Sequence, residues 1–81
     1  MRKNLTRIIS AFEHGQRDAC GSLSTDGNTI FSYMLPIADH YKGGVRVRAS
    51  YPSNTTQGQI NAIKEYFKNS GVSVILRDEI T

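Results

Sequence analysis

Four side chains in this sequence of 81 residues are of the types that form a thiol-nucleophile site, namely Cys20, His14, His40 and Asp39. In such a site a histidine deprotonates the cysteine and a carboxylate orients the histidine. No local nucleophile signature surrounds Cys20, and Asp39 and His40 are neighbours in a segment that we expect to be a connector. We therefore expect no catalytic residues, and we interpret Cys20 as a small, half-buried thiol in a protein that is not an enzyme.

The sequence does not favour a metal or cofactor site. Structural zinc needs four protein ligands, normally in close pairs, and this chain has two histidines and one cysteine. Gly43 and Gly44 enter a predicted strand, whereas phosphate-binding glycine loops leave a strand and enter a helix. We expect a tight turn at these glycines, and neither a metal nor a cofactor.

Arginine and tyrosine residues form a more specific pattern. On a strand, Arg46 and Arg48 project from the same face about 7 Å apart, which is close to the spacing of successive phosphates on one nucleic-acid strand. That strand leads into a predicted helix start, whose unpaired N–H groups need caps and can also bind an anion. Tyrosines supply stacking faces for bases, and arginine and tyrosine are equally the favoured anchors of protein interfaces. The candidate partner-binding residues are Arg46, Arg48, Tyr33, Tyr51, Ser53, Thr55 and Thr56.

The simpler alternative for this pattern is a solvated strand face followed by an ordinary helix cap. Ser53, Asn54, Thr55 and Thr56 provide four candidates for one cap. We interpret this cluster as a structural cap first and as the rim of a binding surface second.

Two helices must position these residues. Apolar residues at spacings of three and four predict one helix that begins after Asn4 and ends at Gly15, and a second that ends at residues 69–71. The buried stripes consist of Leu5, Ile8, Ile9 and Phe12 in the first helix and of Ile60, Ile63 and Phe67 in the second.

The strands are predicted from turn residues and alternation. Asp26 and Gly27 favour a two-residue type I′ turn between strands 22–25 and 28–34, with Thr25 opposite Asn28 and Leu23 opposite Ile30. Pro36 lacks an N–H group, so we expect residues 35–44 to be a connector.

Residues 45–50 alternate apolar and polar side chains, which predicts a strand with one dry and one wet face, and residues 72–76 predict a last strand. The order is αβββαβ. It indicates a two-layer α+β domain over residues 1–81, with a mainly antiparallel sheet and the helices packed on one face.

Composition limits the partners and the setting. Ten lysines and arginines against seven aspartates and glutamates give a net charge of +3, which modestly favours acidic partners such as nucleic acid or acidic protein surfaces. The single cysteine and the absence of any leader or run of eighteen apolar residues favour an intracellular protein without a membrane segment. An exposed edge strand in so small a chain also allows a homodimer.

The segment 22–67 resembles a loose family of small phage and mobile-element proteins. The shared pattern is a "tDG" turn, an "SY..pIA" strand end, a valine-rich strand, and "yS.TT..hqn.i" before a helix. The matching residues are Thr25, Asp26, Gly27, Ser32, Tyr33, Pro36, Ile37, Ala38, Tyr51, Ser53, Thr55, Thr56, Gln59, Ile60 and Asn61. The chain departs from the pattern at Met34-Leu35, where a glycine is usual, and at Gly58, where a histidine is expected.

The resemblance implies a setting more than an activity. Members of that family mostly lack an assigned function, and small phage accessory proteins commonly occupy a surface of a host complex, as anti-CRISPR and other counter-defence proteins do. We therefore expect a non-catalytic inhibitor that binds a host protein or ribonucleoprotein complex in the bacterial cytoplasm. The alternative is direct binding of DNA or RNA through the basic strand face and the helix start.

Overall fold

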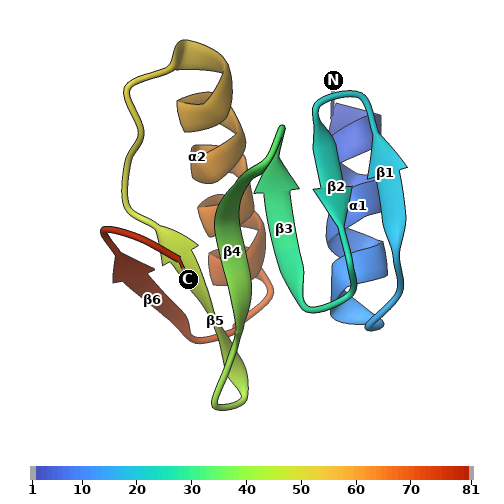
Figure 1. The fold of residues 1–81 in the computed structure, drawn as a ribbon. Helices are drawn as coiled ribbons and strands as arrows, with labels where there is room; N and C mark the ends of the chain where they lie inside the picture. Colours follow the sequence, from blue (N-terminus) through green and yellow to red (C-terminus); the bar gives the residue numbers. More distant parts are fainter. Residues whose placement is uncertain (1, 81) are drawn as a thin grey trace.

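The computed structural model describes residues 2–80, and their side chains from residue 4 onward. Two helices lie behind a six-stranded sheet, and the strands follow one another across the sheet in chain order (Figure 1). All neighbouring strands are antiparallel except β5 and β6, which are parallel. The elements are α1 (Arg2–Glu13), β1 (Asp18–Cys20), β2 (Leu23–Thr25), β3 (Thr29–Ser32), β4 (Leu35–Tyr41), β5 (Gly44–Arg48), α2 (Asn54–Asn69) and β6 (Val74–Arg77).

The predicted α+β class is confirmed, with both helices packed on one face of a mostly antiparallel sheet. The order αβββαβ was incomplete, because the structure adds β1 and β4. The core lies between the two layers and is formed by the apolar stripes of both helices and the inward side chains of β2 to β5. Its fully buried side chains include Ile8, Phe12, Ile30, Ile63 and Phe67.

Helix α1 ends where the sequence indicates but begins earlier. Asn4 lies within the helix, so the prediction that the helix begins after Asn4 was wrong. At the other end Gly15 has a φ of +68°, and the N–H of Gln16 donates to the carbonyl of Ala11 at 2.8 Å. A left-handed glycine with this hydrogen bond is the usual way to satisfy the last carbonyls of a helix.

The hairpin between β2 and β3 has a different register from the predicted one. Thr25 pairs with Ile30 and Leu23 with Ser32, so four residues form the loop. The carboxylate of Asp26 accepts hydrogen bonds from the N–H groups of Asn28 and Thr29, both at 2.9 Å, which closes this wider loop and lowers the pKa of Asp26. A shift of two residues keeps the paired side chains on their predicted faces. The second strand of the hairpin ends at Ser32, however, and not at residue 34 as predicted.

Strand β4 occupies the segment that we expected to be a connector. Pro36 is tolerated because it lies at a β-bulge: Ile30 pairs with Ala38 but Phe31 pairs with Pro36, which leaves Ile37 as the extra residue. Ile37 is fully buried, so the bulge supplies an additional core side chain.

A two-residue turn joins β4 to β5. Tyr41 pairs with Gly44, and the intervening Lys42 and Gly43 have φ angles of +47° and +80°, which is the type I′ geometry. The tight turn expected at the glycines is therefore present. In β5 the predicted alternation is confirmed, because Val45 and Val47 are buried while the arginines of this strand lie on the opposite face.

Helix α2 is capped by Ser53, whose hydroxyl accepts from the N–H of Thr56 at 3.4 Å. Gly71, with a φ of +75°, follows its last turn and directs the chain into β6. Strand β6 begins two residues later than predicted and pairs in parallel with β5.

The face of the sheet opposite the helices, which we call the open face, is partly covered by the chain itself. Beyond β6 the C-terminal segment crosses in front of this face (Figure 1). Ile80 in this segment is only 3% exposed, although it lies outside the main core cluster. The open face is therefore not wholly exposed to solvent.

Candidate functional site

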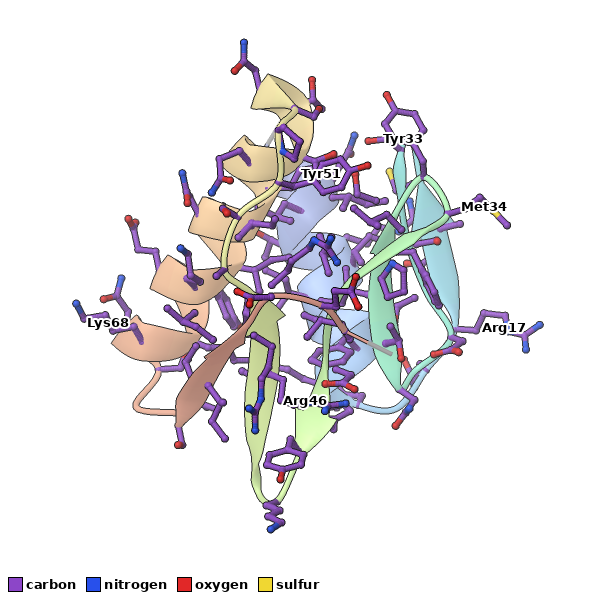
Figure 2. The ribbon with its side chains drawn as sticks, turned by 60° about the vertical axis from the view of Figure 1, so that its left-hand side comes forward. Arg17, Tyr33, Met34, Arg46, Tyr51 and Lys68 are labelled. Carbon is purple, nitrogen blue, oxygen red and sulfur yellow. The ribbon has the colours of Figure 1, made fainter. Side chains whose placement is uncertain are left out.

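Four of the seven predicted partner-binding residues line one shallow hollow. The hollow has a volume of about 410 Å³ and lies between the β3–β4 turn and the start of α2. We call it the turn hollow; its lining residues are Ser32, Tyr33, Met34, Leu35, Tyr51, Ser53 and Thr56. Figure 2 shows Tyr33 and Met34 projecting outward from the turn, with Tyr51 on the neighbouring segment.

The β3–β4 turn displays two large apolar side chains. Ser32 pairs with Leu35, so Tyr33 and Met34 are the central residues of a two-residue turn, and they are 68% and 90% exposed. Tyr33 has a φ of +58°, in a region that favours glycine and is costly for a tyrosine. Its N–H donates to the carbonyl of Ser22 at 2.6 Å, which fixes the turn against the β1–β2 connection.

Tyr51 is positioned from helix α2. Its N–H donates to Oε1 of Gln57 at 2.8 Å, and its carbonyl accepts from the N–H of Ser53 at 2.8 Å. The Gln57 amide in turn donates to Asn61 Oδ1 at 2.9 Å. The first two turns of α2 therefore hold the loop that presents the Tyr51 ring.

The floor of the turn hollow is a buried polar network. The hydroxyl of Ser32 donates to Oε1 of Gln59 at 2.6 Å and lies 3.1 Å from the hydroxyl of Thr56. The amide of Gln59 donates to the Ser22 hydroxyl at 2.9 Å. All three of Ser32, Thr56 and Gln59 are buried. Thr56 is therefore a structural residue, and Ser53 is engaged as the helix cap.

Thr55 lies apart from this hollow. It is exposed and lines a different cavity of about 380 Å³ with Cys20, Ser22 and Gln59 among its neighbours. The predicted cluster of four polar residues is thus divided by the helix into one cap, Ser53, one buried hydroxyl, Thr56, and two exposed side chains, Asn54 and Thr55.

Arg46 is not free to bind a phosphate. It lies directly opposite Asp39 on β4, and its Nε donates to Oδ1 at 2.8 Å while its Nη2 donates to Oδ2. The hydrogen bond with Asp39 raises the pKa of Arg46. The guanidinium also lies 5.0 Å from the centre of the Tyr41 ring. Asp39 is only 7% exposed, so its charge is matched by Arg46 within the fold.

Arg48 has a different environment. Its guanidinium lies 5.1 Å from the centre of the Tyr51 ring, which connects the open face to the turn hollow. Its register partner on β6 is Arg77, so two like charges lie opposite each other. Within the described residues its buried Nε has no hydrogen-bond partner.

The residues of the hypothetical thiol site are engaged elsewhere. His40 donates from Nε2 to the carbonyl of Phe12 at 2.8 Å and stacks on the Phe12 ring at 3.9 Å. Nδ1 of His14 lies 2.8 Å from the carbonyl of Ser10, and the half-buried Sγ of Cys20 accepts a long contact of 3.9 Å from Arg7. Between residues 2 and 80, no three histidine, cysteine or carboxylate side chains are grouped to hold a metal ion.

Sequence reasoning found the two tyrosines but gave Met34 no role. Met34 was missed because residues 28–34 were predicted to form one strand, whereas Ser32 pairs with Leu35 and Met34 lies in the turn between them. The Asp39–Arg46 pair was missed because Asp39 was assigned to a connector.

No protein-family model, curated protein or solved structure matches this chain. Neither of the helices described for residues 2–80 is long and apolar enough to cross a membrane.

Proposed function

We propose that this chain is a non-catalytic protein-binding module whose contact surface is the turn hollow. The observation that carries this proposal is the pair Tyr33 and Met34, two consecutive large apolar side chains that are 68% and 90% exposed. Exposed apolar groups gathered around a concave surface are typical of interaction sites, and tyrosine is among the commonest anchors of protein interfaces.

The backbone at Tyr33 supports the same proposal. A φ of +58° costs a tyrosine free energy that a glycine would avoid, while its exposed side chain adds little to the core. Strained residues of this kind cluster at functional sites, where the position of the side chain offsets the strain. The presence of a large aromatic ring at this position is therefore explained by binding better than by folding.

The resemblance to small phage proteins suggests which partner the turn hollow contacts. In that setting the partner is a protein of a host nucleic-acid-handling complex, such as a CRISPR or other defence complex, and the chain inhibits it by occupying a surface in the bacterial cytoplasm. A mixed aromatic and polar surface suits this role, because interface cores are rich in Tyr and Met and their rims are polar.

Direct binding of DNA or RNA is a second candidate function, favoured by one observation. Arg48 and Arg77 lie opposite each other in register on the open face, next to the Tyr51 ring. The negatively charged phosphate backbone of DNA or RNA would relieve the repulsion between these two arginines. The ion pair of Arg46 with Asp39 removes the other predicted phosphate contact, so we place this function second.

The test is capture of partners from a bacterial host lysate by the purified, tagged protein. We expect the wild type to retain a stoichiometric protein partner in moderate salt, and the double variant Tyr33→Gly with Met34→Ser to lose it. The matched control is Arg17→Ser, an exposed change away from the hollow in Figure 2, which should capture the partner as the wild type does.

Two results would contradict the proposal. One is equal capture by the wild type and the double variant. The other is tight DNA or RNA binding by the pure protein that falls steeply with salt and is lost in Arg48→Glu, which would establish the second function instead.

A further inference from the structure

The outer edge of β6 is an unpaired strand edge. Strand β6 is the last strand of the sheet, and Figure 1 shows no described segment beyond it. In the parallel ladder the N–H groups of Val45 and Ala49 donate to the carbonyls of Ser73 and Arg77. Because backbone groups alternate in direction along a strand, those of Val74 and Leu76 point away from β5. They offer two donors and two acceptors to another strand.

A groove runs along this edge on the side of helix α2. It has a volume of about 570 Å³, and its apolar lining comes from Val72, Val74 and Leu76. Leu76 is 53% exposed, which is unusual for a leucine in a strand beside the core. Lys64 and Lys68 of α2 also line the groove, together with Gly71 and Ser73, and none of these lining residues is acidic.

We propose that this edge binds an extended, acidic segment of a protein partner, which adds to the sheet as a seventh strand. The backbone of the segment pairs with Val74 and Leu76, and its apolar side chains pack on Leu76 in the groove. Its carboxylates bind Lys64 and Lys68. Strand addition of this kind takes its affinity from main-chain hydrogen bonds and its specificity from alternate side chains.

The charges favour an acidic partner over a second copy of this chain. A symmetric pairing of two β6 strands would bring Lys64 and Lys68 of both copies to one groove, which repels like charges. Lys68 is exposed, and among the residues that the structure describes the Lys64 ammonium has a single hydrogen bond, a long one of 3.4 Å to the carbonyl of Ala49. Both ammonium groups therefore retain donors for carboxylates.

The edge is separate from the turn hollow. Figure 2 shows Tyr33 and Lys68 on opposite sides of the molecule. The Tyr33→Gly, Met34→Ser variant should therefore bind peptides at the β6 edge as the wild type does, and failure of either proposal leaves the other standing.

The test uses a random library of eight-residue peptides selected on the immobilised protein. We expect the selected peptides to alternate apolar and acidic residues and to lose binding when alternate amides are N-methylated. The variant Leu76→Pro removes an outward N–H without removing a bond to β5, and it should weaken binding of a selected peptide about tenfold. The matched variant Ile75→Pro removes an inward N–H and should instead destabilise the fold.

A second variant tests the proposal even if Leu76→Pro does not fold. Lys64→Glu with Lys68→Glu changes one half-buried and one exposed side chain of α2, and selection on this variant should favour basic peptides. Selected peptides with no charge preference on the wild type, or an unchanged preference on the double variant, would overturn the proposal. So would sedimentation showing a dimer that Leu76→Pro converts to monomer, because the occupant would then be a second copy.

Discussion

Tyr33 has a backbone conformation that a tyrosine disfavours and that the fold imposes on it. Its φ of +58° places it in the left-handed region, where a side chain costs about 1–2 kcal/mol, and nothing in the core depends on its ring. The sequence could indicate Tyr33 as an aromatic candidate, but it could not show this conformation. The conformation depends on the pairing of Ser32 with Leu35, and that pairing requires β4 to be a strand.

We expect Tyr33→Gly to leave the free energy of unfolding unchanged or to raise it by up to about 1 kcal/mol, because relief of strain outweighs the added freedom of the unfolded chain. The control is Met34→Gly, which changes the neighbouring, more exposed residue without a positive φ and should lower stability by about 0.5–1 kcal/mol. Urea unfolding measures both. A clear loss of stability in Tyr33→Gly would show that the ring supports the fold.

At the scale of elements, the helices were predicted better than the strands, because the helical spacing of apolar residues extends over many residues. The stripes of α1 and α2 span several turns, so Ile8, Phe12 and Ile63 were identified as core residues and are fully buried. The strands are shorter and depend on contacts distant in the sequence. Strand β1 has three residues and no alternation to detect, and β4 was hidden by Pro36, whose missing N–H is accommodated only because a bulge forms there.

Two glycines test how closely the elements pack. A Cβ on Gly44 would lie 2.5 Å from the carbonyl oxygen of Ser73, so Gly44→Ala should displace the chain entering β6 and lower stability by about 1–3 kcal/mol. A Cβ on Gly58 in α2 would meet nothing within 4 Å, so Gly58→Ala should raise stability by about 1 kcal/mol. Thermal unfolding of both variants measures the difference. Equal effects would mean that the contact of Gly44 with Ser73 is looser than described.

At the scale of the whole molecule, the fold assembles the candidate site from separate segments. Tyr33 on the β3–β4 turn and Tyr51 after β5 line one hollow, because the sheet brings both segments beside the start of α2. The structure therefore brings four of the seven predicted residues to one place. Their grouping was not predictable, since it required the true course of β4 and the division of Ser53, Thr55 and Thr56 among three environments.

The open face gives a test at this scale. Ile80 is 3% exposed and holds the C-terminal segment across the sheet, so Ile80→Ser should lower the free energy of unfolding by about 1–3 kcal/mol. The control Leu76→Ser changes an exposed apolar residue and should alter stability by less than about 0.5 kcal/mol. Chemical denaturation of both variants provides the measurement. An effect of Ile80→Ser no larger than that of the control would mean that the segment is not bound to this face.

The order of the strands has a consequence for how the chain folds. Each of β2 to β5 pairs with the strand that immediately precedes it, so these contacts close short loops and can form early. Helix α2 lies between β5 and β6 in the sequence, so their pairing closes a longer loop, and we expect β6 to be the last strand to dock. Until it docks, β5 is the free edge of the sheet and exposes its valine-rich strand to solvent and to other chains.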